Sequence, residues 1–383
     1  MEKVFITKCN DYENSKNALL SILSNFECLN KINSKSKVLI KANLVSALPP
    51  EKGATTNYLL LSFLVEYLKN KGAEVVIGDS PGGLYNKAHL DNIYKVTKMT
   101  ETGAKLNYNF SIKNASNNEA MFLKNFDYTS YIDDFDFKIN FCKLKTHAMM
   151  KMSASVKNLY GTIPGLTKSE YHYRFPNHDD FANMLIDINE YFKFDLNIVD
   201  AVIGMDGNGP TMGNPKKIGA IIASINPYAL DYICAKVINL NPNSVNTIVQ
   251  SEKRGLFNHN EITLNEDINK FSTKDFDLIE NAIDIKFYNH SIVGSAVAKI
   301  FENKPYCYKN KCIKCQKCKN ICPKKAISME NGFPVIDRSK CIKCYCCQEF
   351  CPVGAMRVKT NILNKILFFF CCILVEVVDF HNF

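Results

Sequence analysis

The chain has 383 residues, 46% of them hydrophobic and 22% charged, which excludes an intrinsically disordered protein and leaves room for two or three domains. Basic residues outnumber acidic ones by 47 to 38, giving a net charge of +9, but only four of the basic residues are Arg. Because sequence-specific readers of nucleic acids depend on the forked guanidinium of Arg, we expect no nucleic-acid partner.

Up to about residue 300, short apolar runs alternate with segments of helical periodicity. The apolar runs predict buried strands at residues 38–44, 73–79, 137–144, 196–205 and 218–224. The periodic segments predict helices at residues 57–71, 179–191 and 227–240. Strands that alternate with helices indicate an α/β domain over residues 1–300, built on a mostly parallel sheet with flanking helices. In such a sheet, functional residues are expected in the loops that follow the strands.

Polar side chains stand at or just after several of these predicted strand ends. A lysine is costly to bury there unless it meets an anion, so several converging lysines would bind a phosphate or a carboxylate. We expect a small anionic substrate to be bound by Lys41, Asn43, Lys143, Lys157 and Asn158, with Lys145 and His147 as catalytic residues. The four lysines should then point into one shared cleft, and His147 could donate a proton or act as a ligand.

Two features of this region have structural alternatives that the sequence leaves open. The lysines could occupy ordinary surface positions. The Gly-rich loop at residues 204–210 could cradle an anion, or it could be a structural turn.

Cysteine is the most informative residue type in the chain. There are sixteen, and without an export signal such a number indicates metal or redox chemistry in preference to a disulfide scaffold. Ten of them fall between Cys307 and Cys351. Within this region CIKC at 312–315 recurs at 341–344, and CPKKAI at 322–327 parallels CPVGAM at 351–356, an offset of 29 residues. One unit has been duplicated, which predicts a second, small α+β domain at residues 305–360 followed by an apolar tail at 361–383.

Each copy of the repeat contains the run C-x2-C-x2-C-x3-C-P, the spacing of bacterial two-cluster ferredoxins. A zinc ribbon is the alternative, but it uses two C-x2-C pairs separated by a longer spacer. A four-iron cubane needs four thiolates, three from one run and a fourth from elsewhere. We therefore predict two [4Fe-4S] clusters with crossed ligands, and we expect Cys307 and Cys346 not to be ligands. The first set is Cys312, Cys315, Cys318 and Cys351, and the second is Cys341, Cys344, Cys347 and Cys322.

The charge of this small domain bears on its partner. Between Pro305 and Lys359 ten Lys and two Arg face three acidic residues, a net charge of +9 that equals the excess of the whole chain. Two oxidised clusters, each with four thiolates and a charge of about −2, would lower this to about +5. Such a charge would steer an acidic redox partner protein toward the clusters. A solvated lysine face without a specific partner is the alternative.

Several segments before residue 300 resemble a known prokaryotic family, catalogued as domain of unknown function 362 and often fused to a C-terminal ferredoxin. The resemblance covers about residues 35–300. It rests on IKANLV, GDSPGG, KINFCKLKTH, SVKNLYGTIPG, IVDAVIGMDGNGPTMGNP and NPYALD. It implies an iron–sulfur protein and places Lys143, Lys145, His147, Lys157 and Asn158 at the most characteristic positions of the family. No reaction carries over from it.

These observations favour a ferredoxin-type electron-transfer protein whose clusters deliver electrons to a site in the α/β domain. The first alternative is a reductase that acts on a small anionic substrate bound by that domain. The second is an accessory or sensor protein with structural clusters. No apolar run reaches the ~20 residues that span a bilayer, and the start of the chain lacks an apolar signal core. We therefore expect no transmembrane segment and a cytoplasmic location.

Overall fold

The computed structural model describes residues 1–278 and 303–359, and the chain divides into two compact units, Met1–Asp277 and Leu278–Phe383. The predicted domain boundary near residue 300 and the predicted apolar tail at 361–383 lie outside the described residues. Among the described residues, no helix is both long and apolar enough to cross a membrane.

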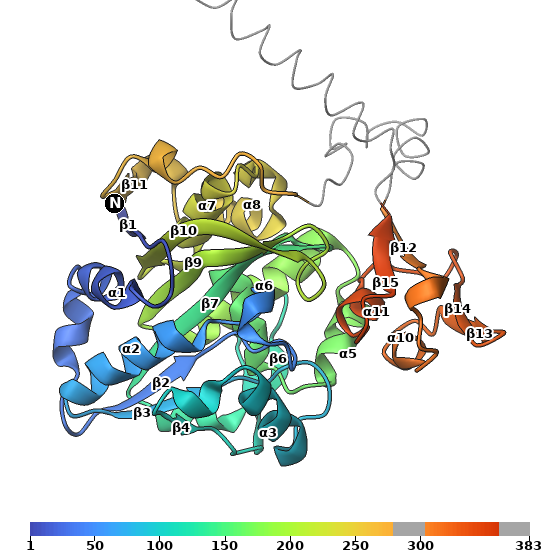
Figure 1. Cartoon of the computed structure of the whole chain (residues 1–383), viewed down its shortest axis with the longest axis horizontal. Helices are drawn as coiled ribbons and strands as arrows, with labels where there is room; N and C mark the ends of the chain where they lie inside the picture. Colours follow the sequence, from blue (N-terminus) through green and yellow to red (C-terminus); the bar gives the residue numbers. More distant parts are fainter. Residues whose placement is uncertain (279–302, 360–383) are drawn as a thin grey trace, which may run out of the picture. The chain divides into compact units, whose positions relative to one another are not determined.

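The first unit is built on a nine-stranded sheet with the order β11-β1-β10-β9-β7-β2-β3-β4, in which β8 pairs with β7 (Figure 1). The strands are β1 (Glu2–Lys8), β2 (Lys37–Lys41), β3 (Glu74–Gly78), β4 (Lys105–Leu106), β7 (Phe137–His147), β8 (Lys151–Ser153), β9 (Leu196–Asp206), β10 (Asn214–Ser224) and β11 (Ile262–Leu264). All neighbouring pairs are parallel except those made by β10 and by β8. The predicted α/β class with a mostly parallel sheet is confirmed.

The main helices of this unit are α1 (Ser15–Leu23), α2 (Tyr58–Asn70), α3 (Lys87–Val96), α6 (His178–Phe192), α7 (Pro227–Val237) and α8 (Asn246–Lys253). Three of them match the predicted helices, and each of the three begins after an Asn. The side chains of Asn57, Asn177 and Asn226 accept hydrogen bonds from the first backbone N–H groups of α2, α6 and α7. These caps satisfy donors that have no partner inside the helix, which is why the helices start there.

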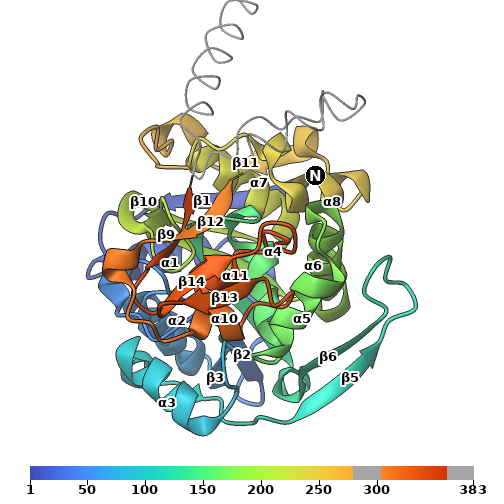
Figure 2. The ribbon, with the colours of Figure 1, turned by 90° about the vertical axis from the view of Figure 1, so that its right-hand side faces the viewer.

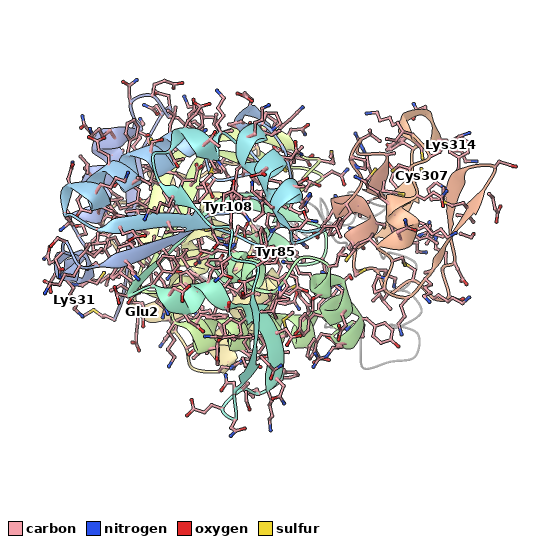
Figure 3. The ribbon with its side chains drawn as sticks, turned by 90° about the horizontal axis from the view of Figure 1, so that it is seen from below. Glu2, Lys31, Tyr85, Tyr108, Cys307 and Lys314 are labelled. Carbon is pink, nitrogen blue, oxygen red and sulfur yellow. The ribbon has the colours of Figure 1, made fainter. Side chains whose placement is uncertain are left out.

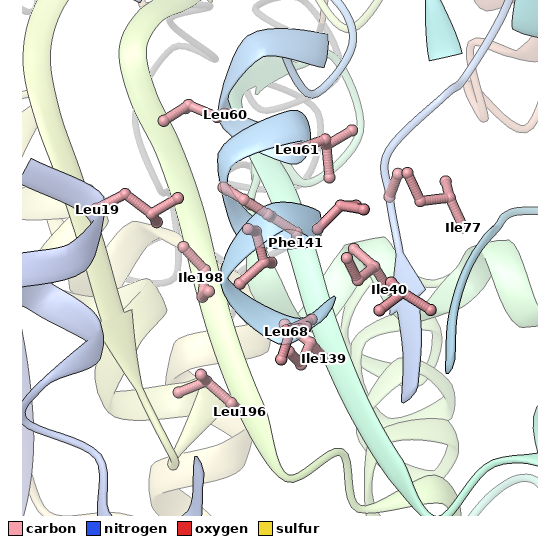
Figure 4. Packing of buried hydrophobic residues seen from close by; sticks show 14 of the residues in the cluster. Leu19, Ile40, Leu60, Leu61, Leu68, Ile77, Ile139, Phe141, Leu196 and Ile198 are labelled. Carbon is pink, nitrogen blue, oxygen red and sulfur yellow. The ribbon is translucent and has the colours of Figure 1, made fainter. Parts of the chain in front are cut away.

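One face of the sheet is covered by α1 and α2. Buried residues of α2 recur at helical spacing, including Leu60, Leu61 and Leu68. They pack with Ile40 and Ile139 of the sheet in one apolar cluster (Figure 4). Burying each such side chain contributes roughly 1.5–3 kcal/mol, so this layer is a main source of the unit's stability.

The register of β2 and β7 decides which polar side chains share a face. Ile40 is opposite Ile139 under α1 and α2, so Lys41 and its neighbour Asn140 point to the other face. There Asn140 donates to Ser155 at the start of the short helix α4 (Ser155–Asn158). Lys143, three positions after Asn140, returns to the α1 face. Alternation along the strand therefore separates Lys41 from Lys143.

A second, two-stranded sheet is formed by the antiparallel hairpin β5 (Ile112–Ser116) and β6 (Asn125–Thr129) (Figure 2). Its far end is attached to α6, because Asp187 accepts the backbone N–H groups of Phe122 and Leu123 at 2.7 and 2.8 Å. Arg254 holds the same carboxylate at 2.8 Å. A single buried carboxylate thus joins the hairpin to two helices.

The second unit, over residues 303–359, has two small antiparallel pairs. One joins β12 (Lys304–Cys307) to β15 (Met356–Lys359), and the other joins β13 (Ile327–Glu330) to β14 (Phe333–Ile336). Two short helices, α10 (Lys317–Asn320) and α11 (Cys346–Glu349), lie within the two cysteine runs. This is the small α+β arrangement predicted for the region.

The duplication seen in the sequence is repeated in the backbone of this unit. Lys314, Gln316 and Lys325 adopt the left-handed conformation, with φ of 59°, 60° and 49°. The residues 29 positions later, Lys343, Tyr345 and Gly354, do the same, with φ of 57°, 59° and 60°. Residues other than glycine rarely adopt this backbone conformation. The five non-glycine residues that adopt it here indicate that the turns around the cysteines are imposed by the site they enclose.

Candidate functional site

Two hollows in the second unit are lined by cysteines. The first, of about 320 Å³, is bordered by the first three cysteines of the first run and by Cys351, the last cysteine of the second run. The second, of about 350 Å³, is bordered by the first three cysteines of the second run and by Cys322, the last cysteine of the first run. Each hollow therefore brings together the four cysteines of one predicted set, including the fourth member that crosses between the repeats. Ligation of iron by these thiols stays a prediction.

The surroundings of the hollows fit an iron–sulfur cluster. Among the described residues, no three Cys, His, Asp or Glu side chains close on a point that could hold a single metal ion. Backbone N–H groups of Ala326 and Ala355, which are 29 positions apart, donate to the sulfurs of Cys322 and Cys351 at 3.2 and 3.1 Å. Hydrogen bonds of this kind stabilise thiolate charge and are one of the means by which a protein sets a cluster's potential.

The two cysteines predicted not to be ligands also lie beside the hollows. Cys307, at the end of β12, borders the first hollow, and Cys346, at the start of α11, borders the second. Cys307 and Lys314 are marked in this unit in Figure 3. Burial raises the pKa of the Cys307 thiol to about 12, with the neighbouring Cys312 adding to the shift. That Cys307 and Cys346 are not ligands therefore stays a prediction, because both border the hollows together with the predicted ligands.

In the first unit, Lys143 is fully buried and belongs to an ion pair. Its ammonium group lies 2.5 Å from the carboxylate of Asp200 and also donates to the hydroxyl of Tyr12 at 2.8 Å. Asp200 in turn accepts the backbone N–H of Asn57 at 3.0 Å, at the N-terminus of α2. The anion that this lysine meets is therefore a carboxylate of the chain itself.

Lys41 is buried on the opposite face and is paired in the same way. Its ammonium group lies 2.7 Å from Asp79, which follows β3, and donates to the side-chain oxygen of Asn158 at 3.0 Å. Asn158 also donates to Asn140 of β7 at 2.7 Å, so it bridges the ends of β2 and β7. A Cβ on Gly161 would collide with both Lys41 and Asp79, which explains why glycine stands over the pair.

Asp231 holds the helix that carries Lys157 and Asn158. Its carboxylate accepts the backbone N–H groups of Ser155 and Val156, the first two of α4, at 2.7 and 3.2 Å. Burial raises the pKa of Asp231 to about 7, and these two hydrogen bonds oppose the shift. Asp231 is thus a positioning residue for Lys157 and Asn158.

Three ammonium groups gather around Asp79. Lys157 and Lys168 both stand over the ring of Tyr160, at 5.8 and 6.0 Å from its centre, and the charge of Lys157 lowers the pKa of both Lys41 and Lys168. Lys168, on α5 (Thr167–Arg174), donates to the backbone carbonyl oxygens of Ser80, at 2.6 Å, and Ile163. Burial lowers the pKa of Lys168 to about 7, with Asp79 opposing the shift and the other two lysines adding to it.

The remaining candidates lie elsewhere. Lys145 is buried on the α1 face of the sheet and donates to the carbonyl of Ala54 at 2.7 Å. His147, at the end of β7, accepts the backbone N–H groups of Met149 and Met150 through Nδ1, both at 3.1 Å. Two donors at Nδ1 leave no place for a proton there, so the ring is neutral with its hydrogen on Nε2. This geometry gives His147 a role in holding the β7–β8 turn.

The prediction that four lysines share one cleft is wrong. The pleat of the sheet places Lys143 and Lys145 on the α1 face, whereas Lys41 lies on the α4 face with Asn158. Lys157 lies with Lys41, and Asn43 follows β2 with its backbone N–H bonded to Thr56 at 2.9 Å. The sequence analysis missed Asp79, Asp200 and Lys168. For Asp79 a signal was present in Gly161 of SVKNLYGTIPG, because the close approach over the Lys41–Asp79 pair requires glycine.

The Gly-rich loop behaves as a structural turn. Its N–H groups at Gly207 and Gly209 donate to the carbonyl oxygens of Asp277 and Gly207, at 2.6 and 2.8 Å, and Gly209 also donates to the hydroxyl of Thr146. Thr146 returns a hydrogen bond to Gly207 at 2.8 Å. These two loop N–H groups already have acceptors within the chain, which supports the structural alternative.

Comparisons with known proteins agree with this division. The family model described as "Domain of unknown function (DUF362)" matches residues 38–236, and the one described as "4Fe-4S dicluster domain" matches residues 311–355. The thylakoid-associated protein sll1697 of Synechocystis sp. is 26% identical over 228 residues, which cover 59% of this chain and 70% of that protein.

Two solved structures have partly similar backbones. The lactate racemase apoprotein from Thermoanaerobacterium thermosaccharolyticum matches with a TM-score of 0.43 and 12% identity, over 63% of this chain and 58% of that one. A protein from Thermotoga maritima matches with a TM-score of 0.36 and 12% identity, over 57% and 56%. The chain therefore spans less than two thirds of either solved protein.

The crossed grouping of the cysteines predicts a paired effect of two distant substitutions. Replacing Cys318 or Cys351 with Ala should damage the same cluster, because both thiols border the first hollow. Cys347→Ala is the matched control and should damage the other one. Electron paramagnetic resonance of the reduced, anaerobically reconstituted variants distinguishes the two clusters. Loss of different clusters in Cys318→Ala and Cys351→Ala would contradict the crossed assignment.

The buried ion pair of Lys143 predicts a large effect on stability. Lys143→Met leaves the Asp200 carboxylate buried without its cation, which should lower the free energy of unfolding by about 3–5 kcal/mol. Adding Asp200→Leu should restore much of that loss. Denaturant unfolding of the full chain, followed by circular dichroism, measures both effects.

A surface pair in the same unit supplies the control for this comparison. The charged groups of Lys16 and Glu66 are 2.7 Å apart, but their side chains are 45% and 47% exposed. Lys16→Met should therefore change the free energy of unfolding by less than about 1 kcal/mol. Equal effects of Lys143→Met and Lys16→Met would show that the buried pair does not stabilise the fold.

Proposed function

The chain belongs to the DUF362 family and carries a 4Fe-4S domain after it, and on that premise we propose that it transfers electrons through two [4Fe-4S] clusters. The observation that carries the proposal is the pair of hollows, each of which is bordered by all four cysteines of one crossed set. Each cluster, when bound, supplies a centre that accepts and releases one electron.

The chain's own groups define the environment of the two centres. Cys318 and Cys347, from different runs, belong to one apolar cluster of this unit, together with Cys351 and Cys322. The two ligand sets are therefore interleaved, which would keep the centres close to each other. Backbone N–H groups directed at the sulfurs, from Lys314, Ala326, Ala355 and Met356, would favour the more negative, reduced state.

This proposal predicts about eight iron per chain after anaerobic reconstitution, because eight thiols in two sets match two cubanes. It also predicts that dithionite reduces both clusters reversibly. Iron analysis and a redox titration followed by electron paramagnetic resonance measure the two properties. Tightly bound zinc without iron would overturn the proposal, and clusters that stay silent across accessible potentials would favour the accessory or sensor role.

A specific observation favours a second candidate, a reductase of a small anionic substrate. In an open parallel sheet, ligands bind beyond the carboxyl ends of the strands where the strand order reverses. Here the chain runs from β2 outward to β3 and β4, and then returns to β7 and β9 on the other side of β2. Lys41, Asp79, Asn158, Lys157 and Lys168 gather at that point.

In this strand-end site Lys168 would have two roles. As an ammonium group it would attract the anion, together with Lys157, which also stands over the Tyr160 ring. Because its pKa is about 7, it could also give a proton to a substrate that is being reduced near neutral pH. Lys41 would keep its place through Asp79 and Asn158.

The reductase candidate predicts a pH-dependent anion affinity. Sulfate should bind more weakly as the pH rises through about 7, because Lys168 loses its positive charge there. Lys168→Met should weaken binding about ten- to a hundred-fold at pH 6, the scale of a lost charge-assisted hydrogen bond. Calorimetric titration of the full chain with sulfate measures this, since sulfate itself does not change charge over that range.

Two variants control this experiment. Lys168→Arg should keep binding at higher pH, because the guanidinium stays protonated. Lys16→Met, at an exposed site that pairs with Glu66, should leave sulfate binding unchanged. A pH-independent affinity, or equal loss in Lys168→Met and Lys16→Met, would remove the case for an anion site here and leave electron transfer as the function.

A further inference from the structure

Positive charge in the second unit is concentrated in the first copy of its repeat. Residues 305–329 contain seven Lys and no acidic residue, whereas residues 330–359 contain five basic and three acidic ones. The net charges are therefore +7 and +2. The excess that could attract an acidic protein belongs almost entirely to the first repeat, which supplies three of the four cysteines of the first set at the first hollow.

The rim of the first hollow also exposes apolar surface. Ile313 is 60% exposed and Val353 is 38% exposed, and both border the hollow. Cys315, between the other two cysteines of its run, is exposed as well. The equivalent residue of Ile313 in the second repeat, Ile342, packs instead against Ile321, Cys344 and Cys346. The two repeats therefore differ at this position, because Ile313 faces solvent whereas Ile342 is partly buried against its neighbours.

Lysines frame this apolar rim. The ammonium group of Lys314 stands 4.7 Å from the centre of the Phe333 ring, and that of Lys309 stands 5.6 Å from it. Lys317 borders the hollow directly. An apolar centre with a charged border is the usual composition of a protein–protein interface. The charge of the border indicates the sign of the partner.

We propose that an acidic one-electron carrier protein docks on the first-cluster face, the surface made by Ile313 and Val353 with Lys309, Lys314 and Lys317 around them. This inference rests on the proposed electron transfer. One electron crosses the face without bond making or breaking, so one protein is oxidised as the other is reduced. Cys315 is the exposed member of the first set, and it gives that electron a short route to the first centre. The second centre then exchanges electrons inside the chain.

The duplication provides a matched pair of variants to test this. Lys314→Glu and Lys343→Glu make the same change at equivalent positions of the two repeats, 29 residues apart. Reduced flavodoxin, an acidic one-electron carrier, is mixed with the full chain in a stopped-flow instrument, and cluster reduction is followed by absorbance. Lys314→Glu should slow the reaction at least tenfold at low ionic strength, whereas Lys343→Glu should change it by less than threefold.

Salt and a second kind of variant test the two components of the face. The difference between Lys314→Glu and the native chain should largely vanish near 1 M salt, where charges are screened beyond about 3 Å. Ile313→Asn should slow the reaction even there, because it removes apolar contact. Val335→Asn is its control, since Val335 is 39% exposed and does not border the hollow. Equal slowing by Lys314→Glu and Lys343→Glu, or none by Lys314→Glu, would overturn the proposal.

A small reductant separates this inference from the function on which it rests. Dithionite needs no docking face, so it should reduce the clusters of every variant with intact iron content. If dithionite fails with the native chain, the proposed electron transfer itself fails. If dithionite reduces the clusters and flavodoxin reduces Lys314→Glu as fast as the native chain, only the proposed docking face is wrong. Should Lys314→Glu lose iron, Lys309→Glu tests the same border from a residue outside the cysteine run.

Discussion

A charge that is buried between a sheet and its helices has to meet an opposite charge, and this constraint organises the α/β unit. Lys143 meets Asp200 on one face of the sheet, and Lys41 meets Asp79 on the other. Each pair joins segments far apart in the chain. Asp200 also accepts the backbone N–H of Asn57, the residue that caps α2, and the Lys41 pair is joined through Asn158 to β7. The strand-end site is therefore assembled around charges that the fold itself requires.

The class of the fold and most of its central elements could be predicted from the sequence, whereas the partners of the buried charges could not. Apolar runs and Asn caps are local, so the central strands and the helices α2, α6 and α7 could be predicted from them. The pairing of Lys41 with Asp79 depends on two strands being neighbours, which no local pattern states. Separating Lys41 from Lys143 required the register of β2 against β7. Lys168 stands in a short helix without any motif, and only packing places it near Asp79.

The cysteine unit was far more predictable, because its information is almost all in spacing. A thiol three residues after another has few geometries that point both at one centre. The repeat offset of 29 residues then fixes which turns must correspond, and the left-handed residues obey it. What spacing could not reveal is the difference between the copies. Ile313 and Ile342 are the same residue in the same motif, yet one faces solvent and the other packs inside, because Ile321 and Cys346 lie only beside the second.

The exchange of the fourth cysteine between the repeats has a consequence for biosynthesis. The first hollow is closed by Cys351, which is translated 33 residues after Cys318. On a ribosome that makes about 5–20 residues per second, three thiols of the first set are exposed for seconds before the fourth exists. Neither half of the unit can hold a finished set alone, so both sets become complete only once the last run has left the ribosome. Premature termination between Cys318 and Cys351 would leave the three earlier thiols of the first set without their fourth member, and so would supply reactive cysteine in place of the first redox centre.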